Sequence, residues 1–265
     1  MLREAEPGQD GRSRRPSRPQ QQAGLHERSR PPKSGRLGEI QRARIVEHAW
    51  EAFKRSRYRE ADSLFRQLLG GSEAQPIDAV CGLSEISRAL GRPAEAASLV
   101  EQALRYHHDD PSLRRQLGYI AYDQRRYEDA TAIFAELVQE FPLSIKDRRW
   151  QVASLRRGRN YQEAAEVLAA APEAVLDDPE LDIERGWVAY RRHKIQRSAD
   201  FQCAAGHFRD AEAHGAPPDL FVPPLVTALL RLDQAAAAEQ VAADAAADAP
   251  LSSPIASAQA DVQVY

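Results

Sequence analysis

Four potential metal ligands are spaced along one stretch in the last third of the sequence. At intervals of four, three and four residues they are Cys203, His207, Asp210 and His214. This spacing puts them on one face of a helix, and thiolate, imidazole and carboxylate groups are typical zinc ligands. Packing is the competing explanation, because Cys203 also falls on the periodic apolar pattern described below. We favour packing and predict no metal site.

Motifs for other chemistry are missing from the sequence. It contains no glycine-rich phosphate loop, no HExxH motif, no GxSxG nucleophile elbow and no paired-cysteine metal knuckle. The His-His-Asp-Asp run at 107–110 lies between expected helices, which favours a solvated turn with helix-capping aspartates. The tryptophans Trp50, Trp150 and Trp187 are more typical of a core than of a cofactor site. We therefore expect no catalytic residue, no cofactor and no enzymatic activity.

The elements that carry these residues repeat along most of the chain. Alanines recur 35, 34, 34 and 35 residues apart, at Ala61, Ala96, Ala130, Ala164 and Ala199. A larger or softer apolar residue follows each by four positions, namely Phe65, Val100, Phe134, Leu168 and Cys203. Positions i and i+4 share one helix face, where the small residue lets a neighbouring helix approach closely. A period of this length is typical of a helical solenoid that serves as a binding scaffold.

Residues 111–142 indicate which kind of repeat this is. The stretch from Pro111 to Tyr122 looks like a first helix, and Arg126-Tyr127-Glu-Asp-Ala130 looks like a turn and the start of a second helix. Related turn phrases begin at Arg57, Arg92 and Asn160. Over roughly residues 42–247 the sequence resembles the tetratricopeptide repeat family, with degenerate fifth and sixth repeats. The resemblance implies an all-α, right-handed superhelical solenoid of antiparallel helix pairs.

The chain divides into three parts by composition and pattern. We expect a helical solenoid over residues 39–248, a disordered basic tail over residues 1–38, and an unstructured tail or linker over residues 249–265. About five to six helix pairs fit the solenoid. Their expected ranges are 40–55 and 58–69, 76–90 and 93–106, 112–140, 145–171, 180–192 and 197–213, and 221–231 and 234–247.

Residues 1–38 differ from the rest in charge and apolar content. They hold nine basic and four acidic residues, a net charge of about +5 that leaves about −8 for the remainder of a chain whose total is −3. With few apolar side chains, this segment cannot offset the entropy cost of ordering. It also lacks the apolar stretch of a secretory signal. A weak contact with an anionic surface is one hypothesis for it, and a solvated tail is the simpler one.

Composition also bears on where the protein works. Two cysteines in 265 residues form no disulfide framework, so nothing indicates an oxidising compartment. The longest apolar runs, such as residues 221–230, are too short and too interrupted by proline to cross a bilayer. We therefore expect no membrane insertion and a cytoplasmic location. Arginine greatly outnumbers lysine, as in many bacterial-type compositions.

The resemblance also predicts a binding surface. In tetratricopeptide arrays the first helix of each repeat lines the concave face, and exposed positions there hold a partner. Guanidinium groups interleaved with aromatic rings suit carboxylates, phosphates and extended peptides. The asparagines and lysines of the family's chaperone-tail clamp are missing at the matching positions, so we do not expect a heat-shock cochaperone. The positions carried over are Trp50, Phe53, Glu85, Arg88, Arg115, Tyr119, Tyr122, Arg149, Arg156, Arg191 and Arg192, with Trp150 as a neighbour in register.

The sequence therefore predicts a scaffold that binds another protein, or an acidic or extended peptide, in an arginine and aromatic concave groove. Packing between repeats is the alternative role for the same side chains. Two other functions stay open. One is an RNA- or polyanion-binding module that combines the groove with the basic tail. The other is a repeat segment of a larger enzyme, regulator, or polysaccharide-export or secretion assembly.

Overall fold

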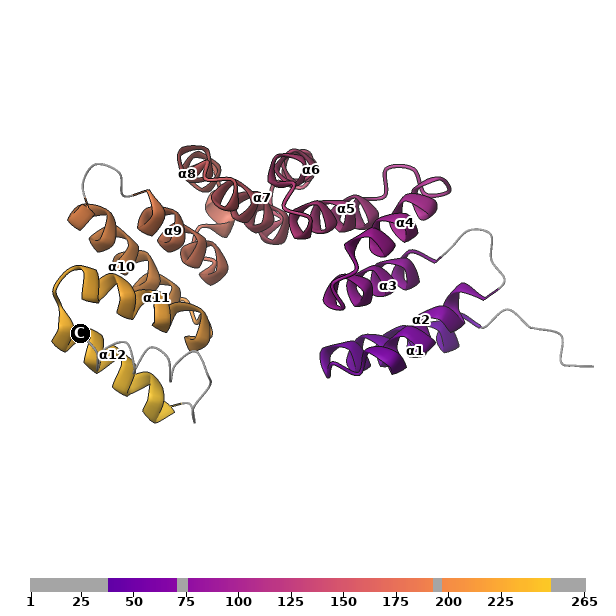
Figure 1. Cartoon of the computed structure of the whole chain (residues 1–265), viewed down its shortest axis with the longest axis horizontal. Helices are drawn as coiled ribbons and strands as arrows, with labels where there is room; N and C mark the ends of the chain where they lie inside the picture. The colour runs from indigo at the N-terminus through magenta and orange to yellow at the C-terminus, as the bar shows by residue number, and fades with distance from the viewer. Residues whose placement is uncertain (1–37, 71–75, 193–196, 249–265) are drawn as a thin grey trace, which may run out of the picture. The chain divides into compact units, whose positions relative to one another are not determined.

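The protein is known here from a computed structural model that describes residues 38–70, 76–192 and 197–248. The expectations for residues 1–37 and 249–265 lie outside the described residues. Within the described residues all regular structure is helical (Figure 1). The elements are α1 (Glu39–Lys54), α2 (Tyr58–Leu69), α3 (Ile77–Ala89), α4 (Pro93–Leu104), α5 (Pro111–Asp123), α6 (Tyr127–Glu140), α7 (Ile145–Arg157), α8 (Tyr161–Ala169), the short 3-10 helix η1 (Glu173–Val175), α9 (Pro179–Arg191), α10 (Arg197–Ala213), α11 (Pro218–Arg231) and α12 (Ala235–Asp248).

The helices pack as antiparallel pairs, each an odd-numbered helix followed by an even-numbered one. Each odd-numbered helix also contacts the next odd-numbered helix, from α1 through to α11. We call this series the odd-helix row. The fold is thus the all-α repeat solenoid that the sequence predicts. No helix among the described residues is both long and apolar enough to cross a bilayer.

The turns inside the pairs share one backbone motif. A residue with positive φ occupies the same place in each of five turns: Ser56, Gly91, Arg125, Arg159 and Asp233. The following amide donates a hydrogen bond to the carbonyl five residues earlier, as from Arg126 N to Ala121 O at 2.9 Å. This is the bond that closes a helix in a Schellman motif. In the α7–α8 turn the left-handed residue is Arg159, while Gly158 keeps a right-handed conformation with φ −73°.

The recurring alanines and the apolar residues four positions after them, which we call the alanine ladder, are buried in the first four pairs. Ala61, Ala96, Ala130 and Ala164 all have 0% exposure, and their apolar partners are between 0% and 4% exposed. The fifth step of the ladder is wrong. Ala199 and Cys203 are exposed, whereas Ala204 and Phe208, spaced four residues apart in the same way, are fully buried in α10. In α12 the fully buried alanine is Ala238.

The register shift arises between α9 and α10, because α9 itself keeps the sequence period. It begins at Pro179, 34 residues after the start of α7 at Ile145, although the nine residues between α8 and α9 include the 3-10 helix η1. The next expected boundary also moves, because α11 begins at Pro218 and contains Pro223 and Pro224 in its interior. Proline lacks an amide donor and usually marks a helix start, which is why the sequence predicts a start three residues later. Burial of Phe221, Val222 and Pro224 holds this turn helical.

Candidate interaction surface

Four of the arginines expected to bind a partner are already bound to carboxylates. Arg88, on α3, is one of them, and its counterparts lie on α5 and α7. Each reaches an acidic residue on the next helix of the odd-helix row, so the ion pairs join neighbouring repeats. The shortest nitrogen–oxygen distances are 2.6 Å for Arg88–Asp123, 2.5 Å for Arg115–Asp147, 2.6 Å for Arg149–Glu180 and 3.2 Å for Arg156–Glu184.

These four pairs differ in exposure. The side chains of Arg88, Arg115 and Arg156 are only 12%, 22% and 18% exposed. Arg149 and Glu180 are more open, at 35% and 46%. The prediction of a groove lined by free arginines is therefore corrected: these guanidinium groups hold repeats together, and Arg149 is the most accessible of the four. Glu85, also predicted in the groove, accepts hydrogen bonds from Arg88 at 2.9 Å and from Gln116 at 3.0 Å.

The pair between α5 and α7 is the most completely formed. Arg115 donates two hydrogen bonds to Asp147, Nε to Oδ1 at 2.5 Å and Nη2 to Oδ2 at 2.8 Å. Ser144, the N-cap of α7, donates its hydroxyl to the same carboxylate at 2.7 Å. Burial alone would raise the pKa of Asp147, but these hydrogen bonds outweigh it and lower the pKa below its ordinary value.

In the Arg156–Glu184 pair, which joins α7 to α9, burial has a larger effect on the carboxylate pKa than the hydrogen bond has. Glu184 is 6% exposed and accepts a hydrogen bond from Arg156 Nε at 3.2 Å. Burial raises the pKa of Glu184, and the nearby Arg156 and Arg149 oppose this rise only in part. The Arg156 guanidinium also lies over the Trp187 ring, 5.7 Å from its centroid.

The predicted aromatic residues pack into the helix pairs. Tyr119 is only 2% exposed, so its assignment as a contact residue is wrong: its ring lies 4.8 Å from Trp150 and 5.4 Å from Phe134. The Tyr119 hydroxyl is buried without a hydrogen-bond partner among the described residues. Tyr122 is half-buried and accepts a hydrogen bond from Arg157 Nε at 3.1 Å.

The two aromatic residues predicted on α1 have a similar role. Trp50 and Phe53 are half-buried, and their rings meet edge to face at 5.8 Å. Trp50 also packs edge to face on the buried Phe65 at 5.2 Å. Both residues therefore help to join α1 to α2, which is the packing alternative that the sequence left open.

The last two predicted arginines are exposed at the end of α9. Arg191 lies over the Tyr190 ring, 5.8 Å from its centroid. Arg192 lines a cleft between α8 and α10, away from the odd-helix row. The predicted residues thus do not form one strip of available cations.

Sequence reasoning missed a cleft within the odd-helix row itself. Helices α7, α9 and α11 enclose a volume of about 480 Å³, and we call it the α7/α9/α11 cleft. Its apolar lining includes Trp187 and Leu220, and Leu220 is 46% exposed although it is a large apolar side chain. The Arg149–Glu180 pair forms part of the lining. Binding clefts are usually lined by apolar side chains with a few polar groups among them, as this one is.

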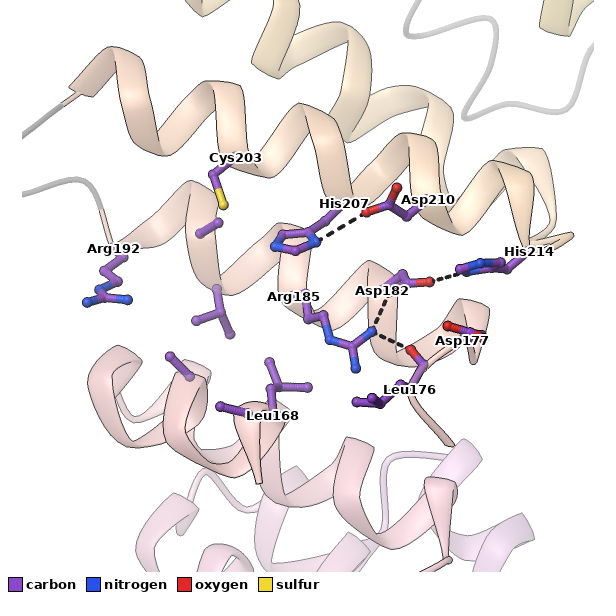
Figure 2. A pocket seen from close by; sticks show the side chains of 14 residues that line it. Leu168, Leu176, Asp177, Asp182, Arg185, Arg192, Cys203, His207, Asp210 and His214 are labelled. Atoms are coloured by element: carbon purple, nitrogen blue, oxygen red, sulfur yellow. Dashed lines mark hydrogen bonds and ion pairs between the residues drawn. The ribbon is translucent and has the colours of Figure 1, made fainter. Parts of the chain in front are cut away.

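The possible metal ligands face a different cleft. Cys203, His207, Asp210 and His214 all line the opening between α8 and α10 (Figure 2). His207 lies 3.6 Å from Asp210, and His214 Nδ1 lies 2.7 Å from Asp182 Oδ2. Among the described residues, no three histidine, cysteine or acidic side chains are arranged to hold a metal ion. The packing explanation for Cys203 is wrong, because this residue is exposed.

Comparison with known proteins agrees with the repeat architecture. Residues 83–145 match the family model described as tetratricopeptide repeat. This part of the chain is therefore a tetratricopeptide repeat region. A search of curated proteins finds no match.

Solved tetratricopeptide structures resemble the chain in fold. PilF of Pseudomonas aeruginosa has a TM-score of 0.61 at 15% identity, covering 83% of this chain and 97% of its own. PilW, described as a type IV pilus biogenesis factor, has 0.65 at 17% identity, covering 83% and 98%. A tetratricopeptide protein of Thermus thermophilus has 0.58 at 19% identity, covering 72% and 100%. At these identities the likeness establishes the fold alone.

Proposed function

We propose that this tetratricopeptide repeat protein is a non-catalytic scaffold that binds a segment of a partner protein along the odd-helix row. The observation that carries the proposal is the α7/α9/α11 cleft, where Leu220 stands 46% exposed beside Trp187. A partner side chain placed there would remove apolar surface of both molecules from water. The expected cytoplasmic location rests on the sequence alone.

The charge of the bound segment follows from which arginines can change partner. Arg88, Arg115 and Arg156 are mostly buried with their carboxylates, so a new ligand would have to displace those groups. The Arg149–Glu180 pair is partly solvated on both sides, and pairs of that kind contribute only about 0–1 kcal/mol. Releasing Arg149 from Glu180 therefore costs little, so a carboxylate of the partner can bind Arg149, against the opposing negative charge of Glu184 and Asp219 in the same lining. An acidic, extended segment anchored at Arg149 is the form of the acidic-peptide hypothesis that we propose.

Polyanion binding has less support. It requires a surface of free cations, whereas the four central arginines of the row are paired with carboxylates. The basic N-terminal segment lies outside the described residues. A binding constant that falls steeply with salt would revive this alternative.

Site-specific photocrosslinking tests the proposed surface. A benzophenone amino acid is placed at Leu220 in the full chain, and in a matched control at Leu90, which is 48% exposed and lies outside the cleft. In native lysate, Leu220 should crosslink to a partner that Leu90 does not. Thr227→Arg, which fills the cleft from a half-buried position, should remove that product while helix content stays unchanged. Equal crosslinking at both positions, or a product that survives Thr227→Arg, would overturn the assignment.

Charge variants then decide the class of segment. Arg149→Glu should weaken capture of the crosslinked partner, and Glu180→Gln should strengthen it, because it frees Arg149. The opposite pattern would show that the cleft prefers a basic segment. Unchanged capture in both variants would mean that the pair takes no part in binding.

A further inference from the structure

A second concave surface lies on the side of α9 that faces away from the α7/α9/α11 cleft. It is the opening between α8 and α10, with a volume of about 570 Å³, and we call it the α8–α10 trough (Figure 2). Its apolar lining comes from Leu168 on α8 and from Val188 and Ala189 on α9. Ala165 and Ala169 add small side chains along α8. The volume is within the range of about 300–1,000 Å³ that is usual for binding clefts.

The dimensions and lining of the trough suit a helix. Its floor follows α9 from Asp182 to the C-cap Arg192, eleven residues with a rise of about 15 Å, which is close to three turns. Helices flank it on both sides, as in a bundle from which one member has been removed. Small side chains at Ala165, Ala169 and Ala189 allow close approach of another helix backbone. An amphipathic helix laid in an apolar groove is a recurrent mode of recognition.

Charges mark the two ends of the trough differently. At one end Asp182 is bound by Arg185 at 2.5 Å and by His214 at 2.7 Å, with Asp177 beside them. At the other end lies Arg192, which is exposed and forms no ion pair with any residue in the described part of the chain. Figure 2 shows Asp177 and His214 at one end and Arg192 at the other.

The dipole of α10 gives the same polarity. Helix α10 ends at Ala213, next to His214, so its C-terminal end lies at the end of the trough that holds His214 and Asp177. The C-terminal end of a helix carries a partial negative charge. The end of the trough near Asp177 therefore favours the positive N-terminal end of an incoming helix, and Arg192 favours its negative C-terminal end.

From this complementarity we propose that the α8–α10 trough is a docking site for one amphipathic helix of a partner protein. The helix lies antiparallel to α10, with its apolar face on Val188 and Ala189. Its first turn carries a basic side chain toward Asp177, and its last turn carries an acidic side chain toward Arg192. This site is separate from the α7/α9/α11 cleft, so the chain holds two partners or two segments of one.

Stapled model helices test the proposal without knowledge of the natural partner. Two 14-residue peptides share one leucine and alanine stripe; the first has lysine in its first turn and glutamate in its last turn, and the second has these two exchanged. The staple holds both equally helical. Fluorescence anisotropy with the full chain should give at least fivefold tighter binding of the first peptide. Equal affinities, or binding of neither, would overturn the proposal.

Matched variants of the full chain locate the site. Arg192→Glu should remove the preference for the first peptide, whereas Arg191→Glu, a change at the adjacent exposed arginine outside the trough, should leave it intact. Ala169→Trp fills the trough from an exposed position and should reduce binding of both peptides at least tenfold. Equal effects of the two arginine changes, or binding that tolerates Ala169→Trp, would place the peptides elsewhere.

Discussion

The α5–α6 pair and the α9–α10 pair use the same packing device in two different sequence registers. In each, a fully buried phenylalanine of the even-numbered helix lies on a glycine of the odd-numbered helix, Phe134 on Gly118 and Phe208 on Gly186. A Cβ atom at Gly118 would lie 2.6 Å from the Phe134 ring, and one at Gly186 would lie 2.5 Å from the Phe208 ring. Contacts that short leave no room for any residue except glycine.

The two pairs differ in where this device falls along the repeat period. Ala130 and Phe134 are on the ladder, while Ala204 and Phe208 come five residues after the expected positions at Ala199 and Cys203. Five residues turn a helix by about 140° from the expected face, since each residue advances about 100°. The stripe that contains Cys203 therefore leaves the core and becomes a wall of the α8–α10 trough. A register shift thus creates a surface without losing the packing device.

Among the changes that test this comparison, truncation of the two phenylalanines should have the largest effect on the free energy of unfolding. Phe134→Ala and Phe208→Ala should each cost about 3–5 kcal/mol in the free energy of unfolding, because both side chains have 0% exposure. Cys203→Ala, at the position that the ladder predicts to be buried, should change it by less than about 0.5 kcal/mol. Urea unfolding followed by circular dichroism measures all three. A large cost for Cys203→Ala would mean that Cys203 is buried, as the repeat period predicts.

Enlarging the buried alanines should have the next largest effect on the free energy of unfolding. Ala130→Leu and Ala204→Leu overpack fully buried sites and should each cost about 1–3 kcal/mol. Ala199→Leu adds the same atoms at an exposed position and should stay within about 0.5 kcal/mol. Thermal melting of the three variants ranks them. If Ala199→Leu were as costly as Ala204→Leu, both faces of α10 would have to be buried.

The carboxylates of the Arg115–Asp147 and Arg156–Glu184 pairs should make the free energy of unfolding change with pH in opposite directions. The lowered pKa of Asp147 means that its contribution is present above the ordinary carboxyl pKa and is lost as pH falls through the lowered value. Asp147→Asn should therefore cost about 1.5–3 kcal/mol near pH 7 and progressively less in acid. The raised pKa of Glu184 makes its ionised form unfavourable above pH 4.5, so stability falls as pH rises through this range.

Glu184→Gln is the matched control for that experiment. It keeps an acceptor for Arg156 and removes the buried charge, so it should change stability at pH 7 by less than about 1 kcal/mol. Urea unfolding of both variants at pH 3, 5 and 7 gives the two pH slopes. Parallel slopes for the two variants would show that these carboxylates have the same environment.

The smallest expected effect is at the end of the α9–α10 pair. The hydrogen bond with Asp182 raises the pKa of the exposed His214 above its ordinary 6.5, and Asp177 and Asp210 add to the rise. The stabilising contact is fully present below pH 6.5 and is lost as pH rises through the raised pKa. NMR titration of the His214 ring should give a midpoint above 6.5 that moves downward in Asp182→Asn. An unchanged midpoint would mean that the contact does not form in solution.

Much of the fold followed from residue spacing. The alanines on α2, α4, α6 and α8 are buried as their period indicates, and the second helices begin inside the predicted turn phrases, at Tyr58, Tyr127 and Tyr161. Local rules suffice here because each repeat packs mainly on its neighbours, so a local pattern and its tertiary contact coincide. The pattern failed between α9 and α10: α9 begins 34 residues after α7, but the fully buried Ala204 comes 40 residues after Ala164, so the period no longer identifies the buried face of α10.

The candidate site was less predictable. Each paired carboxylate comes 28 to 35 residues after its arginine, close to one repeat, so a search for opposite charges at that spacing would have indicated the ion pairs. The arginine positions by themselves predict free cations, whereas the acidic residues one repeat later bind them. Leu220 gave no comparable signal, because its exposure depends on how α11 meets α9.

The sequence by itself determined the repeat period, the helix pairs and the small and large residues that join them, because these depend on contacts within one repeat and between adjacent ones. Only the tertiary structure decided which polar side chains are bound to each other and which face open space. Pairing of Arg115 with Asp147, or exposure of Cys203 beside the trough, depends on the rotation of each helix relative to its neighbour. That rotation is fixed by side-chain packing across the helix interfaces and cannot be read from the spacing of residues along a single helix.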